Sequence, residues 1–282
     1  MMDNMLQKII DFIKKETVLT IATVLAVVSA FWVHPGRQYV DYIDWRVLGI
    51  LLSLMLIVAG FQSNGLFDAI GSRLLAKTKN TAQLMLVLVF LCFFSSMFIT
   101  NDVALLTFVP FACTILQKCH QERLIVTAFV LQTLAANLGS MLTPIGNPQN
   151  LYLYSISGAG LGEFIGWMAP YTLVSGVLLL LVVFVLSAGK RRISLETGAL
   201  LQTSGAAGRK KNGIYLALFV LSLLSVARVL PWELMLAVVL IVLIFTDRAV
   251  FLQVDYCLLF TFISFFIFIG NMGNIEAVRS VL

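Results

Sequence analysis

Long apolar runs separated by short polar segments dominate the pattern along this chain. Runs of this length and continuity are typical of helices that cross or lie within a membrane. The apolar runs are residues 18–33, 47–61, 82–99, 103–116, 124–157, 164–186, 214–230, 232–245 and 256–270. Two further segments, 1–15 and 65–80, mix apolar residues with Lys and Arg at helical spacing, which predicts helices at the membrane surface. The pattern predicts an all-α polytopic membrane protein.

Composition agrees with this prediction. Of the 282 residues, 60% are apolar and 12% are charged, whereas soluble proteins have about 45–50% apolar and about 25% charged residues. The net charge of +5 does not indicate nucleic-acid binding, because the basic residues cluster in short loops between apolar runs. The four cysteines show no paired spacing, so neither a disulfide framework nor a zinc site is expected. No cleavable signal is evident, and the first apolar run is expected to be retained.

The distribution of Lys and Arg predicts the topology. Cytoplasmic loops of bacterial-type inner-membrane proteins are enriched in these residues. With a cytoplasmic N-terminus, most of the 19 basic residues fall inside. The exceptions are Arg37, Arg46, Arg228 and Arg279, of which Arg228 is interpreted as an outer-loop charge. We therefore expect a multi-pass protein of the inner (plasma) membrane.

An internal repeat is visible in the same pattern. Asp44 precedes an apolar run that ends near Gly60, and Asp255 precedes one that ends near Gly270. On the predicted topology the two runs cross in opposite directions, which is the inverted repeat of many secondary transporters. The predicted divisions are 1–42 (interfacial segment and first span), 43–188 (first repeat), 189–212 (cytoplasmic linker) and 213–282 (further helices and the start of a second repeat). Because the repeat would continue beyond Leu282, the chain is expected to be either truncated or a natural half-protein.

Two polar runs interrupt the apolar pattern and are the candidate site. Thr100, Asn101 and Asp102 lie between runs 82–99 and 103–116, and the second of these is shorter than the roughly 20 residues needed to span a membrane. This favours a re-entrant hairpin over two full spans. Residues 139–150 contain Pro144 and Pro148 and predict a broken helix. Polar and non-helical backbone at membrane depth persists where it lines a path or is buried in protein. Two simpler interpretations stay open: the polar triplet caps a helix, and the prolines only kink one.

The residue types at these runs indicate ion chemistry. Asn101 and Asn147 offer amide oxygens, Ser96 offers a hydroxyl, and Gly139 and Gly146 allow the backbone to bend and present its carbonyls. Oxygen ligands of this kind suit a desolvated sodium ion, and the N-termini of the helices that follow could face an anion. Asp102 could bind a cation or exchange a proton.

Both runs resemble signatures of a known group. Residues 98–106 (FITNDVALL) and 137–150 (NLGSMLTPIGNPQN) are similar to the two N-terminal-half signatures of the ion transporter superfamily, which contains citrate transporter-like proteins, arsenite permeases, sodium/proton antiporters and sodium-coupled dicarboxylate symporters. The resemblance covers residue 40 onward. The hairpin tip of the dicarboxylate branch reads Ser-Asn-Thr, whereas Thr100-Asn101-Asp102 is closer to the arsenite and antiporter branches.

The resemblance implies roles for individual residues. It implies ion binding, Na+ in particular, at Ser96, Thr100, Asn101 and Gly139. It implies a substrate side formed by Asp102, Thr143, Asn147 and Asn150. The implied activity is secondary transport of an anion such as a carboxylate or arsenite, coupled to Na+ or H+, with no other cofactor. The lipid bilayer is the expected environment, and families of this kind often form homodimers.

Other functions stay open. A truncated or inactive half-transporter and a sodium/proton antiporter are the alternatives to an anion permease. An enzyme is the least favoured class, because the apolar runs contain no nucleophile and base pair, no zinc motif and no pair of carboxylates. No catalytic residue is therefore predicted.

Overall fold

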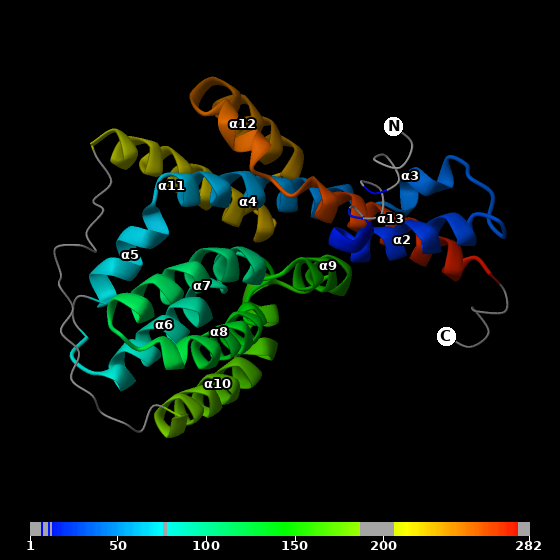
Figure 1. Ribbon diagram of the computed structural model, residues 1–282. Coiled ribbons are helices and arrows are strands. Elements are labelled where there is room, and N and C mark those ends of the chain that lie inside the picture. The colour runs from blue at the N-terminus through cyan, green and yellow to red at the C-terminus, as the bar shows by residue number, and fades with distance from the viewer. Residues whose placement is uncertain (1–6, 8–10, 12, 76–77, 187–205, 276–282) are drawn as a thin grey trace. The chain divides into compact units, whose positions relative to one another are not determined.

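The computed structural model describes residues 7, 11, 13–75, 78–186 and 206–275. Helices are the regular structure throughout this part of the chain, which confirms the all-α prediction (Figure 1). The longer helices are α2 (Thr17–Ser29), α4 (Trp45–Ser63), α5 (Leu66–Leu75), α6 (Thr81–Ser95), α7 (Asn101–Lys118), α8 (Ile125–Ser140), α9 (Pro148–Ser157), α10 (Leu161–Leu186), α11 (Ala206–Val226), α12 (Trp232–Thr246) and α13 (Tyr256–Gly273). Short helical segments are α3 (Gln38–Tyr42), η1 (Glu122–Leu124) and η3 (Arg248–Leu252).

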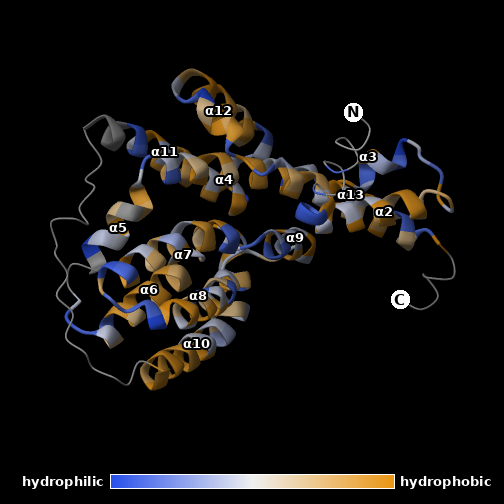
Figure 2. Cartoon of the chain, in the orientation of Figure 1, coloured by the Kyte–Doolittle hydropathy of each residue, from blue (hydrophilic) through white to orange (hydrophobic). Residues whose placement is uncertain are grey.

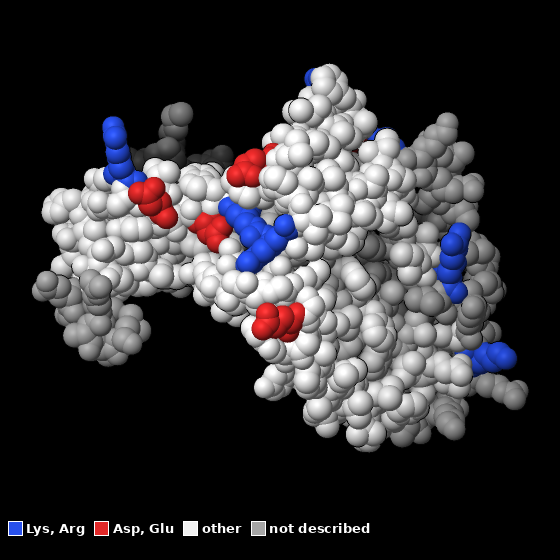
Figure 3. Space-filling model, turned by 180° about the vertical axis from the view of Figure 1, so that it is seen from behind, with Lys and Arg blue, Asp and Glu red and all other residues white. Residues whose placement is uncertain are grey.

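Four helical segments in the described residues are long and apolar enough to cross a membrane. They are Trp45–Ser63, Glu122–Ser140, Leu161–Leu186 and Tyr256–Gly273. Helices α10 and α12 are apolar along most of their surface (Figure 2), and leucines and valines on α10 are exposed. Charged side chains are sparse on the face in Figure 3. Since exposed apolar helices of this kind are stable in lipid rather than water, the chain is a multi-pass membrane protein.

The chain forms two compact units. The terminal unit contains Met1–Leu52 and Gln253–Leu282, and the central unit contains Ser53–Leu252. Helix α4 begins in the first unit and ends in the second. Both predicted polar runs lie in the central unit.

The core of the central unit is the packing of α6, α7, α8 and α10, which lie side by side (Figure 1). Small residues on α8 allow this packing, since Ala128, Ala135 and Ala136 are almost completely buried. In membranes, helices associate closely where small residues let their backbones approach. The α6–α7 hairpin therefore lies against the first half of the broken helix.

In the terminal unit, α2 and α13 run parallel. Thr23 contacts Ser264 (Oγ1 to Oγ, 3.3 Å), and further along both helices Asn271 donates to Oγ of Ser29 (2.9 Å). Asn274, at the end of α13, donates to the hydroxyl of Tyr42, three residues before α4 begins. Helix α4 thus begins at the end of the pair where α13 finishes.

The structure corrects some predicted boundaries. Helix α6 ends at Ser95 instead of residue 99, because residues 96–100 form the hairpin turn. Helix α7 has 18 residues, more than the run 103–116, because its first turn includes the polar residues Asn101 and Asp102. Helix α11 begins inside the predicted linker 189–212 with Ala206, where Ala, Lys and Arg favour helix. Residues 189–205 of that linker lie outside the described residues.

Candidate functional site

The predicted break in the helix is confirmed between α8 and α9. Helix α8 ends at Ser140 and α9 starts at Pro148, leaving residues 141–147 non-helical. Pro148 is in the first helical turn, where its missing N–H costs nothing. At Gly146 the chain passes so close to Ser140 that a Cβ would overlap the carbonyl of Ser140. The loop is therefore folded back tightly on the end of α8.

The side chain of Asn150 holds this loop. Its Nδ2 lies within hydrogen-bonding distance of the carbonyl oxygens of Ser140 (3.2 Å), Met141 (2.9 Å) and Thr143 (3.1 Å). Asn150 is buried. The carbonyl of Ser140 belongs to the last residue of α8, which has no intrahelical partner, and the other two lie in the loop that follows. Asn150, expected on the substrate side, thus has a clear structural task, since it satisfies the backbone of the break.

Asn147 is the N-cap of α9. Its Oδ1 accepts from the backbone N–H of Asn150 at 2.7 Å, and its Nδ2 donates to Oγ of Ser140 at 3.2 Å. The side chain therefore bridges the start of α9 and the end of α8. These two contacts fix the orientation of the Asn147 amide. The N-terminus of α9 therefore lies at the loop.

The hairpin turn between α6 and α7 carries the other predicted residues. Thr100 is the N-cap of α7, with a long contact from the N–H of Val103 to its Oγ1 (3.5 Å), so the simpler capping interpretation is confirmed for Thr100. Asp102 lies exposed in the first turn of α7, where a carboxylate is stabilised by the helix dipole.

Three hydrogen bonds join the hairpin turn to the broken helix. The backbone N–H of Asn101 donates to the carbonyl of Gly146 (3.0 Å), and Nδ2 of Asn101 donates to Oδ1 of Asn137 (3.1 Å). The hydroxyl of Thr143 donates to the carbonyl of Met97. The two polar runs, which α7 and α8 separate in the sequence, thus form one cluster.

Gly139 and Ser96 meet within this cluster. A Cβ at Gly139 would overlap the carbonyl oxygen of Phe93 and lie 2.7 Å from Oγ of Ser96. The hydroxyl of Ser96 donates to the carbonyl of Phe93 (3.0 Å), and Ser96 is fully buried. Only glycine allows α8 to come this close to the end of α6.

The cluster offers neutral oxygen atoms. Oδ1 of Asn101 accepts no hydrogen bond from the described residues, because the contacts of this side chain run through its Nδ2. Within the same part of the chain, no three His, Cys, Asp or Glu side chains gather as a metal site. Amide, hydroxyl and carbonyl oxygens suit hard cations such as Na+ and do not suit transition metals.

Asn137 in the cluster and Arg228 outside it make contacts that the sequence pattern did not indicate. Asn137 was part of the second signature, yet its pairing with Asn101 could be seen only in the fold. Arg228 is not simply a solvated charge: its guanidinium donates to the carbonyls of Tyr154 (3.2 Å) and Gly158 (3.1 Å) at the end of α9. The guanidinium also lies 5.1 Å from the centre of the Tyr154 ring. The positive charge of Arg228 was the signal in the sequence for such a contact, because cations are stabilised at the C-terminal ends of helices.

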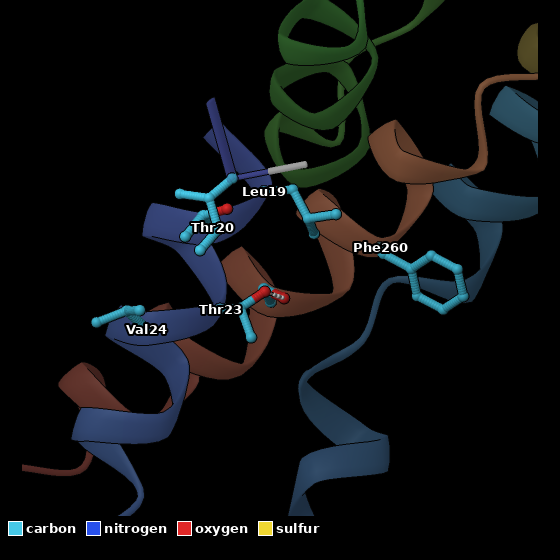
Figure 4. Close-up of a pocket in the computed structure, with 7 residues that line it drawn as sticks. Leu19, Thr20, Thr23, Val24 and Phe260 are labelled. Atoms are coloured by element: carbon cyan, nitrogen blue, oxygen red, sulfur yellow. Dashed lines mark hydrogen bonds between the residues drawn. The ribbon is translucent and has the colours of Figure 1, made fainter. Parts of the chain in front are cut away.

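A separate groove lies in the terminal unit between α2 and α13 (Figure 4). It has a volume of about 450 Å³ and is lined by Ile13, Leu19, Thr20, Thr23, Val24, Phe260 and Ser264. None of the residues predicted for the site lines it. Its lining is mostly apolar and contains no charged side chain, so it offers a bound ion little beyond three hydroxyl groups.

Comparison with known proteins defines the class. The citrate transporter family matches residues 5–282, and the chain belongs to this family. It is 32% identical over 259 residues to the inner membrane protein YbiR of Escherichia coli, covering 90% of this chain and 66% of YbiR. It is 30% identical over 242 residues to an uncharacterized transporter of Methanocaldococcus jannaschii, covering 84% of this chain and 63% of that protein. The chain thus spans about two thirds of these relatives. The predicted resemblance to this group of transporter families is thereby confirmed.

Proposed function

We propose that this protein is a secondary active transporter that moves a small anion coupled to Na+ or H+. The observation that carries the proposal is the joining of the hairpin turn to the broken helix through Asn101, which contacts both Gly146 and Asn137. This contact gathers neutral oxygens around the start of two helices, α7 and α9. Sites of secondary transporters combine these elements, with carbonyls for the coupling ion and helix N-termini for the anion.

The roles within the site follow from the contacts. The Oδ1 of Asn101, the Oγ of Ser96 and the backbone around Gly139 are the proposed cation ligands, with Thr100 holding the start of α7. Asp102 and the N-terminus of α9 at Asn147 form the proposed substrate side. Thr143 and Asn150 shape the loop, since Asn150 donates to its carbonyls. Citrate and related carboxylates or arsenite are the anion classes that we propose.

Helix directions support an inverted repeat, whereas the proposed cytoplasmic N-terminus in the inner membrane rests on the distribution of Lys and Arg. Because α2 runs parallel to α13, and α4 starts at the end of this pair where α13 finishes, α4 and α13 would cross the bilayer in opposite directions. Asp44 and Asp255 cap these two helices in the same way, through the N–H groups of Val47 (3.0 Å) and Leu258 (3.2 Å). This is the relation expected between the opening helices of two inverted repeats.

Uptake into proteoliposomes tests the proposal. Labelled citrate, succinate and arsenite are offered under a Na+ gradient or a pH gradient, with Asp102→Ala, Asn147→Ala and the control Gln149→Ala, an exposed neighbour on α9. We expect ion-driven uptake of one of these anions that falls at least about tenfold in the first two variants. Equal flux in Asp102→Ala, Asn147→Ala and the parent protein would reject the site.

A sodium/proton antiporter is the second candidate. Asp102 favours it, because this carboxylate lies exposed at the proposed site and an acidic group can exchange Na+ for a proton. A pH-sensitive dye inside the same proteoliposomes distinguishes the two functions. Acidification of the lumen driven by Na+ efflux in the absence of any anion substrate, lost in Asp102→Asn, would favour the antiporter.

A further inference from the structure

Gln132 connects three helices inside the central unit. It lies in the middle of α8 and is completely buried. Its Nε2 donates to the carbonyl of Leu88 on α6 (3.1 Å) and to that of Phe108 on α7 (3.2 Å). A carbonyl oxygen has two lone pairs, so each of these can accept from Gln132 and still serve its own helix. One side chain therefore ties both arms of the hairpin to the broken helix.

Stability alone does not account for this glutamine. Its Oε1 is buried and accepts no hydrogen bond within the described part of the chain. The cost of an unpartnered buried acceptor is at least as large as the small gain from interhelical hydrogen bonds in membranes. A leucine would fill the same space without this cost. The position of Gln132 must therefore serve something besides the free energy of folding.

The location of Gln132 relates it to the site. Gln132 and Gly139 are seven residues apart on α8, which places them on the same face about 10 Å apart along the helix axis. Between them, Ala135 and Ala136 are fully buried. At one end of this face Gln132 fixes the position of Leu88 and Phe108, and at the other end Gly139 touches Ser96. A sliding or tilting of either hairpin arm would change both contacts together.

We infer that Gln132 is a positioning residue, which holds both arms of the α6–α7 hairpin in register with α8 so that the oxygens of Ser96, Asn101 and Gly139 keep the spacing of a cation site. This inference rests on the proposed function for the identity of the site. The contacts of Gln132 themselves do not depend on it. The residue acts through the helices and touches none of the proposed ligands.

Two measurements on the purified full chain test this inference. The first is hydrogen exchange of the hairpin turn, residues 96–104, in Gln132→Leu, which removes both donated bonds at similar volume. The control is Gln62→Leu, an exposed glutamine on α4. We expect faster exchange at the turn in Gln132→Leu, with exchange in α12 unchanged and no effect in the control. A general loss of stability would instead raise exchange in α12 as well.

The second measurement is the rise in the thermal unfolding midpoint with NaCl, compared with choline chloride at equal ionic strength. Loss of a residue that orients metal ligands lowers affinity about 10–100-fold. We expect the Na+ concentration for half-maximal stabilisation to rise at least about tenfold in Gln132→Leu and to be unchanged in Gln62→Leu. Unchanged exchange at residues 96–104 in Gln132→Leu would overturn the positioning role. So would a Na+ response of Gln132→Leu equal to that of a parent protein that does respond to Na+. If the parent protein itself shows no Na+ response while the exchange result holds, the proposed Na+ site fails and the register role of Gln132 remains.

Discussion

Asn101, at the start of α7, donates from Nδ2 to Oδ1 of Asn137 on α8, at 3.1 Å. Asn137 is itself oriented, because its own Nδ2 donates to the carbonyl of Thr133 one turn earlier (2.8 Å). The direction of the Asn101 amide is thus set by a neighbour whose direction is set by its helix. The consequence is that Oδ1 of Asn101 keeps a fixed orientation at the junction of the two polar runs.

Asn150 is expected to stabilise the break between α8 and α9. Asn150→Leu leaves the carbonyls of Ser140, Met141 and Thr143 without their shared donor. We expect a loss of about 1–3 kcal/mol in stability, measured by thermal unfolding in detergent. Gln149→Leu, on the exposed neighbour, is the matched control and should leave the midpoint nearly unchanged. Equal midpoints for the two variants would contradict this assignment.

Gly139 is expected to tolerate no side chain. In Gly139→Ala the new methyl group overlaps the carbonyl of Phe93, which is backbone and cannot move alone. We expect separation of α8 from α6 and a loss of about 1–3 kcal/mol, seen as a lower unfolding midpoint and a smaller monodisperse yield. Gly166→Ala on α10 has open space around it and should have little effect. The prediction fails if both variants behave alike.

Arg228 is expected to hold the C-terminal end of α9. Arg228→Gln removes the charged donors to Tyr154 and Gly158, so hydrogen exchange across residues 154–158 should become about tenfold faster, which corresponds to about 1.4 kcal/mol. Arg228→Lys keeps the charge and should retain part of the protection. Arg248→Gln, which removes a comparable donor from the end of α12, serves as the control and should leave α9 unchanged.

The backbone of Arg228 offers a further check on the same contact. Arg228 has a φ of 63°, a conformation that glycine adopts without strain. Arg228→Gly therefore relieves the backbone strain in the turn between α11 and α12 but removes the guanidinium. If the guanidinium holds α9, this variant should exchange as fast at residues 154–158 as Arg228→Gln does. Protection at the parent level would mean that the turn, and not the side chain, holds the helix end.

The parallel pairing of α2 with α13 predicts a labelling pattern. The native Cys92, Cys113, Cys119 and Cys257 are first replaced. Single cysteines are then placed before the two helices, at Lys15 and Gln253. Others are placed at Gly36, which follows α2, and at Gly273, the last residue of α13. Because the helices are parallel, the first pair should lie on one side of the membrane and the second pair on the other. A membrane-impermeant maleimide applied to intact cells should label Gly36→Cys and Gly273→Cys only. Labelling of one member of each pair would contradict the parallel arrangement.

The class of protein, most of its helices and the position of the candidate site could be predicted from the amino-acid sequence. Continuous apolar runs leave the backbone no stable choice in a bilayer except helix, so the membrane fold follows from composition and period. The break at residues 141–147 could also be predicted, since Pro144, Pro148 and two nearby glycines disfavour helix. Helix ends were less predictable: α6 stops at Ser95 although the apolar residues continue, because the turn to α7 needs that length of chain.

Which side chains meet could be seen only once the helices were packed together. Asn137 pairs with Asn101 across 36 residues of sequence, Gln132 reaches two helices at once, and Arg228 contacts α9 from a turn 70 residues away from Gly158. An Asn or Gln in an apolar run marks a polar partner but does not identify it, because the partner depends on how helices rotate and cross. That choice is made by close packing, here at Gly139, where the absence of a side chain brings α8 against α6.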